Sequence, residues 1–446
     1  MPSFWCEMAW LGGDAATPGV LLDVTGDRIT AISSGVDCPA DAVRLAGLTL
    51  PGLANAHSHA FHRVLRGRTQ TGIGSFWTWR EKMYTAAARL DPDSYHRLAR
   101  AVYGEMAMAG ITAVGEFHYL HHGAGGVPYT DPNAMGEALV AAAAEAGVRI
   151  TLLDTCYVQG GIGVAPNEVQ QRFSDGDGLS WATRATALRA LESATCKVGA
   201  AIHSVRAVPP ATIQMVAAWA GRHDAPLHAH VSEQPAENEQ CIEAYGLTPT
   251  ALLGERGALT GRFTAVHATH LAVSDIELYG SHRCTICMCP TTERDLADGI
   301  GPALMLRDAG ARLALGSDSH AVIDLFEEAR GVEMDERLAS LTRGSHDAPS
   351  LLRAATRHGH DSLGWHEAGS LAVGSLADFI SLRLDSVRTA GTTADCAAEG
   401  AVFAASAADV HTVVVDGEVI VRDGVHQRID VAAELRATIT ELMAPT

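Results

Sequence analysis

Residues 48–63, LTLPGLANAHSHAFHR, contain an apolar run that leads into His57-Ser58-His59. Side chains two positions apart in a β-strand point to the same side. We therefore expect His57 and His59 to aim together at one point just beyond the end of a strand. Two convergent imidazoles suit a divalent transition metal, above all zinc, whereas an isolated pair of this kind is equally a pair of surface histidines. Further ligands elsewhere in the chain are needed to decide between the two.

Downstream of this stretch, short apolar segments alternate with alanine-rich segments whose apolar residues recur every three or four positions. The alternation predicts strands joined by helices. Eight such strands within roughly 300 residues predict an α/β fold of the (β/α)8 TIM-barrel type. The expected strands are residues 48–56, 111–117, 148–155, 198–202, 226–229, 264–266, 285–288 and 312–316, and the clearest helices are 93–108, 132–146, 181–193 and 210–222.

Both ends of the chain predict further strands. Asp416-Gly417 between two apolar runs is a strong signal for a two-residue hairpin. Because neither end has enough apolar surface for its own core, we expect the two ends to pair into a small β-sandwich domain beside the barrel. The predicted division is 1–50 and 369–446 for the sandwich and 51–368 for the barrel. The expected strands are residues 4–10, 20–24, 29–32 and 48–51 at the N-terminal end and 378–384, 410–416 and 418–422 at the C-terminal end.

Composition limits the partners. The 446 residues carry a formal net charge of −19, which argues against nucleic acid and against anionic membrane surfaces. No apolar run reaches the length of about 18 residues that a membrane span needs. The first residues lack the features of a signal peptide, and the nine cysteines are scattered and odd in number, so we expect reduced thiols and a cytoplasmic protein. The expected assembly is a homodimer.

Three of the cysteines could form either a metal-binding cluster or part of the core. Cys284, Cys287 and Cys289 have the spacing of a metal-binding cluster, but they lie in an apolar segment that reads as a strand. No second pair follows at the spacing of a zinc ribbon. Buried core thiols are therefore the favoured interpretation.

Ionisable side chains follow most of the predicted barrel strands. Active sites of this fold lie at the C-terminal ends of the strands, whereas buried core histidines are not expected to sort themselves in this way. The sequence therefore predicts an active site at that end of the barrel. The residues at the predicted strand ends are His57, His59, His118, Tyr119, Tyr157, His203, Arg206, His230, His267 and Asp318.

Four of these residues can be nominated as metal ligands: His57, His59, His230 and Asp318. Three imidazoles and one carboxylate leave room for a water molecule, as a catalytic site requires. Zinc lowers the pKa of such a water from 15.7 toward roughly 7 and so makes a hydroxide available. The main rival ligand is His228, which shares the predicted strand face with His230.

Two further residues are candidates for the proton transfers. Glu233 lies three residues after His230, a distance that suits a carboxyl group beside the metal, and a proton shuttle is its natural role. The alternative is a carboxylate placed to favour a helix N-terminus. His267 can polarise the substrate or steady the hydroxide, and Asp318 can take the proton of the water. His270 is a nearby decoy.

The set of motifs resembles the amidohydrolase superfamily: HxH after the first strand, His then Glu after the fifth, His after the sixth and Asp after the eighth. The segment GSLAVGSLADFISL, residues 369–382, also resembles the stretch where these enzymes leave the barrel. Many binuclear members carry a carboxylated lysine at the end of the fourth strand, where this chain has His203, and Lys197 lies near the start of that strand. The resemblance therefore implies the mononuclear deaminase branch and one zinc ion per chain, with another divalent transition metal possible.

A narrower resemblance exists to the N-formimino-L-glutamate deiminases of bacterial histidine breakdown. It is carried by HSHAFHRVLRGRT (57–69), SFWTWREKMY (75–84), EFHYLHH (116–122) and HSVRAV (203–208). That family converts its substrate to N-formyl-L-glutamate and ammonia. The resemblance implies a small-molecule substrate that carries two carboxylates and an amidine-like head.

The residues fit such a substrate independently. Arg80 and Arg206 suit bidentate contacts with carboxylates, and Tyr119 and His203 can add hydrogen bonds. The plainer alternatives are a surface salt bridge between Arg80 and its neighbour Glu81, and a structural ion pair for Arg206.

His62 departs from the family, since we expect glutamine at that place in at least some members. A substrate-binding role for His62 follows only because either side chain can form hydrogen bonds.

Two other functions compete with the deiminase. Another deaminase of the branch, for guanine, cytosine or an adenosine derivative, would favour stacking aromatic rings and amide side chains. A non-catalytic relative would have lost metal ligands, and this chain retains a full set.

Overall fold

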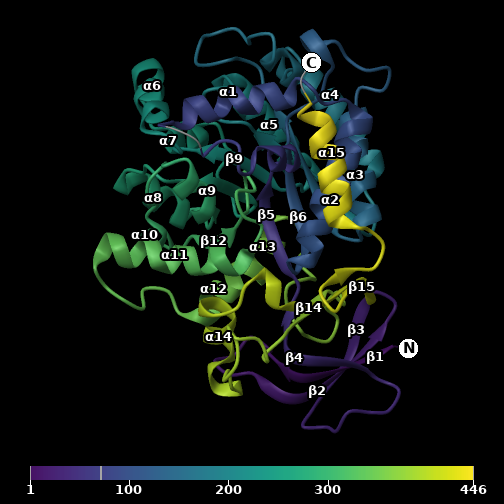
Figure 1. Cartoon of the computed structure of the whole chain (residues 1–446). Coiled ribbons are helices and arrows are strands. Elements are labelled where there is room, and N and C mark those ends of the chain that lie inside the picture. The colour runs from purple at the N-terminus through teal and green to yellow at the C-terminus, as the bar shows by residue number, and fades with distance from the viewer. Residues whose placement is uncertain (1, 71–72, 445–446) are drawn as a thin grey trace.

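The computed structural model describes residues 2–70 and 73–444, and within them the strands form two eight-stranded sheets. One sheet is entirely parallel and follows the order of the chain, with helices between successive strands, so the predicted (β/α)8 barrel is confirmed (Figure 1). Seven of the eight strands lie within two residues of the predicted bounds. The barrel strands are β5 (Leu53–Ser58), β6 (Ile111–His118), β7 (Arg149–Cys156), β8 (Cys196–Ile202), β9 (Leu227–Val231), β10 (Phe263–His267), β11 (Thr285–Met288) and β12 (Arg312–Leu315).

The first predicted strand, residues 48–56, was wrong as a single element. It is divided at Gly52 between β4 (Val43–Pro51), which belongs to the other sheet, and β5 of the barrel. A Cβ atom at Gly52 would lie only 2.2 Å from the hydroxyl oxygen of Thr112 on β6, so only glycine allows the chain to pass this close. The apolar run therefore serves two sheets in succession.

The barrel closes where its first strand meets the segment after its last. Ser58 forms a parallel bridge with Asp318, and the amide of Asp318 donates to the carbonyl of His57 at 3.0 Å. Deeper in the barrel, the side chain of Asn55 donates to Ser317 Oγ at 2.7 Å and accepts from the Ser317 amide at 2.9 Å. The closure thus brings the HSH motif and the predicted aspartate into contact.

The helices follow standard sequence signals. α2 (Pro92–Met108) begins after Asp91, whose carboxylate accepts from the Ser94 amide at 2.8 Å, has proline at its first position and is followed by Gly110 with a φ of 87°. The other helices of the barrel region are α1 (Phe76–Ala87), α3 (Ala134–Ala146), α4 (Gly178–Leu188), α5 (Pro210–His223), α6 (Pro235–Tyr245), α7 (Pro249–Glu255), α8 (Val273–Ser281), α9 (Pro290–Asp295), α10 (Ala303–Asp308), α11 (Leu325–Ser340), α12 (Ala348–Arg353) and α13 (Gly359–Ser362).

The second sheet combines both ends of the chain, as expected; some of its apolar side chains form a core cluster of their own, and others join the core of the barrel. β4 joins the two ends, because it pairs in parallel with β1 and antiparallel with β13. The predicted hairpin is present: Asp416 and Gly417 have φ of 59° and 74°, as a type I′ turn requires. The strands, in spatial order, are β16 (Val425–His426), β15 (Glu418–Arg422), β14 (Val410–Val415), β13 (Phe379–Leu382), β4, β1 (Ser3–Ala9), β2 (Thr17–Thr25) and β3 (Arg28–Ser34).

Two helices of the C-terminal segment were not predicted: α14 (Ala397–Phe403) and α15 (Val431–Leu442). α15 lies along α2 (Figure 1), where Arg97 and Glu441 form an ion pair at 2.7 Å and Arg100 pairs with Glu434. Among the described residues, no helix combines the length and apolarity needed to cross a bilayer.

Candidate metal centre and cavity

A cavity of about 250 Å³ opens at the C-terminal ends of the barrel strands. All the residues named at the predicted strand ends line it except two: His57, which lies fully buried beneath, and His118, which is buried with its Nε2 3.3 Å from Nδ1 of His121. The lining residues are His59, His62, Phe76, Trp77, Trp79, Arg80, Met83, Tyr84, Tyr119, Tyr157, Gly160, Gly161, Phe173, His203, Ser204, Arg206, Ala207, His230, Glu233, Gln240, His267, Leu296 and Asp318.

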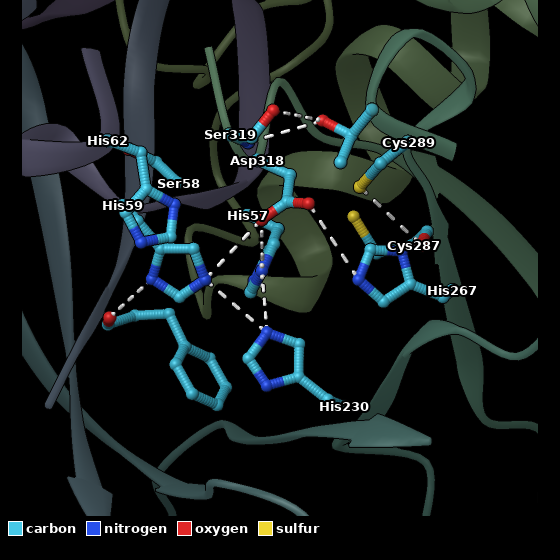
Figure 2. Close-up of polar contacts among 12 residues, drawn as sticks. His57, Ser58, His59, His62, His230, His267, Cys287, Cys289, Asp318 and Ser319 are labelled. Atoms are coloured by element: carbon cyan, nitrogen blue, oxygen red, sulfur yellow. Dashed lines mark hydrogen bonds and ion pairs between the residues drawn. The ribbon is translucent and has the colours of Figure 1, made fainter. Parts of the chain in front are cut away.

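The four nominated ligands converge at the base of this cavity (Figure 2). The Nε2 atom of His230 lies 3.1 Å from Nε2 of His57 and 3.4 Å from Nε2 of His59. Oδ1 of Asp318 lies 3.2 Å from His57 Nε2 and 3.4 Å from His59 Nε2. Three strand ends, those of β5, β9 and β12, therefore bring four donor atoms together, each within 3.4 Å of at least one other.

Backbone carbonyls fix the orientation of two of these imidazoles. Nδ1 of His59 lies 3.0 Å from the carbonyl of Phe117, and Nδ1 of His230 lies 2.9 Å from the carbonyl of His203. A carbonyl only accepts, so each Nδ1 carries the hydrogen and each Nε2 presents its lone pair to the shared point. This tautomer is the one that binds a metal through Nε2.

The protonation states also fit a divalent cation. Burial is the largest influence on His57, His59 and His230 and lowers the pKa of each, which keeps them neutral. Burial raises the pKa of Asp318, but contacts with His57 and His267 outweigh it and hold the pKa below its usual value. Neutral imidazoles and an ionised carboxylate are the states that metal binding requires.

His267 lies closer to this centre than the sequence indicated. One ring nitrogen of His267 belongs to a group of four possible ligand atoms that all lie within 4.8 Å of one another. The other three are a ring nitrogen of His57, a ring nitrogen of His230 and a carboxylate oxygen of Asp318. Nε2 of His267 is 3.8 Å from Oδ2 of Asp318, the contact drawn in Figure 2. The centre is therefore bordered by a fifth donor group.

The rival ligands lie elsewhere. His228 lies two residues before His230 on β9, and its Nε2 contacts the carbonyl of Ser362 at 3.0 Å. Nε2 of His270 contacts the carbonyl of Asp298 at 2.7 Å. The three neighbouring cysteines of the 284–289 segment are buried free thiols, as predicted.

Glu233 stands between the centre and the cavity wall. Oε1 lies 3.7 Å from Nε2 of His267, and Oε2 lies 3.7 Å from a guanidinium nitrogen of Arg206. Burial raises the pKa of Glu233, and the positive charges of His267 and Arg206 oppose this. A carboxyl group in this position can hold or release a proton within the cavity.

Glu293, which was not among the predicted site residues, contacts His267 on the side away from Asp318 and Glu233. Oε1 of Glu293 lies 3.4 Å from Nδ1 of His267 and accepts from the Cys289 amide at 2.9 Å. Although burial lowers the pKa of His267, Glu233 and Glu293 more than reverse this and raise it well above its usual value. Glu293 follows a predicted strand end by only a few residues, which was the available signal.

Several residues at these strand ends have left-handed backbone conformations that non-glycine residues rarely adopt. The φ angles are 53° at Ser232, 68° at His267, 50° at Ala268 and 41° at Asp318. Such conformations persist only where the surrounding structure enforces them, and they cluster at functional sites. Here they aim the side chains that border the centre.

Both predicted carboxylate-binding arginines line the cavity. The guanidinium of Arg80 lies over the rings of Trp77 and Tyr84 at 4.5 and 5.6 Å, and within the described residues it forms no ion pair, with Glu81 or any other carboxylate. Arg206 is held by Glu237, with its Nε 3.1 Å from Oε2. The structural ion pair considered for Arg206 is therefore present, whereas the surface salt bridge between Arg80 and Glu81 is absent from the described residues.

The remaining predicted residues form one aromatic wall. Nε2 of His62 lies 2.9 Å from the hydroxyl of Tyr119, and the rings of Tyr119 and His203 lie 5.5 Å apart. The ring of Tyr157 lies 4.7 Å from that of His203. His62, Tyr119 and His203 are thus brought together beside the centre.

Comparison with known proteins agrees with this geometry. The sequence profile of the amidohydrolase family matches residues 48–420. A formimidoylglutamate deiminase from Pseudomonas aeruginosa is 39% identical over 420 residues, which cover 91% of this chain and 92% of that protein. A 5-methylthioadenosine/S-adenosylhomocysteine deaminase from Natronomonas pharaonis is 28% identical over 435 residues and 95% of each chain.

Solved structures show the same fold. The crystal structure of an amidohydrolase from Brucella melitensis superimposes with a TM-score of 0.92 at 32% identity and covers 100% of both chains. An adenosine deaminase from Xanthomonas campestris with bound zinc gives a TM-score of 0.85 at 23% identity, over 99% of this chain and 97% of that one.

Proposed function

Because the chain belongs to the amidohydrolase family and is a hydrolase that acts on carbon–nitrogen bonds, we propose that it hydrolyses N-formimino-L-glutamate to N-formyl-L-glutamate and ammonia. The observation that carries this proposal is the pairing of a metal-binding donor set with two arginines in one cavity. The relative that is 39% identical is named for this activity.

We propose one zinc ion per chain, held by His57, His59, His230 and Asp318. The fixed tautomers of His59 and His230 support this ligand set, and the Xanthomonas campestris relative binds zinc. When bound, zinc supplies the Lewis acidity that makes a water molecule acidic near neutral pH. The base that accepts a proton from that water is Asp318 or Glu233.

The proton transfers are proposed for Glu233 and Asp318, with His267 as the polarising group. Glu233 can take a proton from the attacking water and give it to the nitrogen that leaves as ammonia. Its position between His267 and Arg206 supports this, because both neighbours face the cavity. His267, backed by Glu293, is placed to donate a hydrogen bond toward the reacting carbon's new oxygen.

The acidic part of the substrate is proposed to bind Arg80 and Arg206. The protein has a net charge of −19, so an anionic substrate needs local cations to enter and orient. Tyr119, His203 and His62 are proposed to hydrogen-bond the formimino-glutamate from the wall next to the metal. Arg80 is the better candidate for a free carboxylate partner, because it has no ion pair within the described residues.

A second candidate is a deaminase of guanine, cytosine or an adenosine derivative. The aromatic rings that line the cavity favour it, among them Phe76, Trp79 and Tyr119, because a nucleobase would stack on them. The 28%-identical relatives are named 5-methylthioadenosine/S-adenosylhomocysteine and 8-oxoguanine deaminases. The two arginines favour the acidic substrate over this alternative.

The deciding experiment is steady-state kinetics with ammonia detection on N-formimino-L-glutamate beside a panel of nucleobases and nucleosides. We expect kcat/KM for N-formimino-L-glutamate to exceed every other value by at least about a thousandfold, since a site built for charged groups rejects analogues that lack them. A nucleobase or nucleoside as the preferred substrate would replace the proposal with the second candidate.

We further propose that the reaction serves histidine degradation in the cytoplasm and that the protein is a homodimer. The free state of all nine cysteines agrees with a reducing compartment. Light scattering of the purified protein tests the dimer.

A further inference from the structure

The segment after β7 contains a glycine-rich loop, Gly160-Gly161-Ile162-Gly163. Gly160 and Gly161 line the cavity. A Cβ atom at Gly160 would lie 2.6 Å from Oε1 of Gln170, so this glycine allows the buried Gln170 side chain to reach the cavity wall.

The orientation of the Gln170 amide is fixed by its own neighbours. The backbone amide of Asn167 donates to Oε1 of Gln170 at 2.9 Å, and the backbone amide of Gln170 donates to Oδ1 of Asn167 at 2.9 Å. Because a backbone N–H only donates, Oε1 is the acceptor and the opposite atom is the NH2 group. The amide group therefore presents only hydrogens to the cavity wall.

Three oxygen atoms surround that NH2 group. Nε2 of Gln170 lies 2.7 Å from the hydroxyl of Tyr157, 3.1 Å from the hydroxyl of Tyr84 and 3.2 Å from the carbonyl of Gly160. An amide nitrogen cannot accept, so neither phenol can donate its hydrogen to Gln170, and the two N–H bonds are shared among the three oxygens. Each phenol must then direct its own hydrogen elsewhere.

Both phenols line the cavity, next to its two arginines. In the part of the chain that the structure describes, neither hydroxyl has an acceptor for its hydrogen. The guanidinium of Arg80 lies over the Tyr84 ring at 5.6 Å. Burial and Tyr84 raise the pKa of Tyr157, while the positive charges of Arg206 and Arg80 oppose the rise. Two O–H donors and two guanidinium groups therefore face one volume.

We propose that Tyr84 and Tyr157, oriented by Gln170, are specificity-determining donors that bind a carboxylate of the substrate together with Arg80 and Arg206. This rests on the proposed function for the identity of the substrate, but only on the cavity for its acidic class. Neutral O–H donors add hydrogen bonds to a carboxylate without further charge. Gln170 is a positioning residue, because it acts through the two phenols.

The first experiment measures binding of glutarate, a dicarboxylate that cannot react, to the metal-loaded protein by calorimetry. Hydrogen bonds to charged groups are the strong class, so we expect Tyr84→Phe and Tyr157→Phe each to weaken binding by about tenfold or more. Tyr245→Phe, on α6 and outside the cavity, should bind glutarate like the parent. If the Tyr84→Phe/Tyr157→Phe double variant binds glutarate as tightly as the parent, the inference is overturned.

The second experiment separates orientation from packing. Gln170→Met keeps the length of the side chain but removes the NH2 group, and Gln171→Met, at an exposed neighbouring position, is its matched control. If Gln170 acts through the phenols, its effect on glutarate binding should largely disappear in the double Tyr→Phe background. Full additivity there would contradict the positioning role.

Kinetics on N-formimino-L-glutamate distinguish the two proposals. In the Tyr→Phe variants we expect KM to rise by about tenfold and kcat to change little, because the donors bind ground state and transition state alike. For N-formiminoglycine, which has one carboxylate, the loss should be smaller. A parent protein that binds glutarate through the tyrosines but does not hydrolyse N-formimino-L-glutamate would support this inference and contradict the proposed function.

Discussion

At the scale of single residues, the metal centre concentrates donor atoms that would repel one another without a cation. The imidazoles of His57, His59 and His230 are buried. Nε2 of His230 lies 3.1 Å from Nε2 of His57 and 3.4 Å from Nε2 of His59, and Oδ1 of Asp318 lies 3.2 and 3.4 Å from the same two atoms. We expect one divalent metal per chain by elemental analysis. Because a metal that binds only the folded state stabilises it, chelation should abolish activity and lower Tm.

The matched test of the ligand set compares two histidines. His230→Ala should lose the metal, and His270→Asn, whose side chain contacts the carbonyl of Asp298, should retain it. Two metals per chain would contradict the argument from the missing lysine at the fourth strand.

Glu233 gives the second prediction. Glu233→Gln keeps the shape of the side chain but cannot move a proton, so kcat should fall by about 10²- to 10⁴-fold, with metal content unchanged. Glu239→Gln, at an exposed position on α6, is the control. Near-normal turnover in the metal-loaded Glu233→Gln protein would contradict a role for Glu233 in proton transfer.

Arg80 gives the third prediction. A charged hydrogen bond contributes roughly 1.5–3 kcal/mol, so Arg80→Met should lower kcat/KM by about one to two powers of ten, and Arg80→Lys should restore it only in part, since an ammonium lacks the planar fork. Arg222→Met, exposed on α5, should match the parent. A substrate without the matching carboxylate should lose little further in Arg80→Met; an equal loss with both substrates would show that Arg80 is structural.

The sequence predicted which residues of the site converge, because strand ends of one barrel meet at one edge. His57, His59, His230 and Asp318 were accessible to this argument. Glu293 and Gln170 were not singled out. Glu293 lies in the helix that follows β11 and Gln170 in a short helical turn of the long segment after β7, where polar residues are ordinary, and only their contacts with His267 and with the two phenols reveal their roles.

At the scale of the element, the segment after β7 is attached to the barrel by one buried arginine. Arg184 on α4 binds Asp154 at the end of β7 with two contacts of 2.7 and 2.9 Å, and Asp175 with two of 2.8 Å. His122 adds a 3.0 Å contact with Asp175. Burial alone would raise the pKa of Asp175, but His122 and Arg184 hold it far below its usual value.

A depressed pKa fixes the sign of the fourth prediction. The stabilisation from Asp175 is complete above the pKa of the unfolded chain, about 3.9, and is lost as the pH falls through the lower pKa of the folded state. The stability difference between the parent and Asp175→Asn should therefore be constant from pH 7 to about 5 and shrink below about 4. Denaturant unfolding across this range measures it, and a difference that grows in acid would contradict the assignment.

Element boundaries show where sequence reasoning ends. Seven barrel strands were predicted to within two residues, because their apolar runs are short and isolated. The run at 48–56 was not, because two consecutive strands of different sheets share one apolar pattern, and only the 2.2 Å approach of Gly52 to Thr112 separates them. α15 was missed because we expected only strands beyond residue 369.

At the scale of the whole molecule, part of the terminal sheet has a core cluster of its own, whereas other side chains of that sheet, among them Leu50, Ile380 and Val413, belong to the core cluster of the barrel. The division 1–50, 51–368 and 369–446 stays a proposal. α15 lies in the C-terminal segment yet packs along α2 of the barrel (Figure 1). This helix therefore lies on the barrel rather than on the sheet to which the preceding strands belong. The two parts should unfold together if the contacts between them are strong.

One of these contacts is a buried ion pair. Arg149, at the start of β7, has no exposed surface and binds Asp378, which precedes β13 of the terminal sheet, through contacts of 2.6 and 3.1 Å. It also binds Asp416 of the hairpin at 2.6 Å. Asp378 in turn accepts from the Asp416 amide at 2.9 Å, so one guanidinium ties a barrel strand to two segments of the sheet.

Removing one member of a buried pair leaves the other charge uncompensated, which costs roughly 3–5 kcal/mol. Arg149→Met should therefore lower the unfolding free energy by about that amount. In Arg149→Met/Asp378→Asn the loss should be smaller than the sum of the two single losses, because the unpaired carboxylate is gone. Arg97→Met, which breaks an exposed ion pair with Glu441, should stay close to the parent. Denaturant unfolding of the four variants measures these differences, and an Arg149→Met protein as stable as Arg97→Met would mean that the barrel and the sheet are held together by their apolar contacts alone.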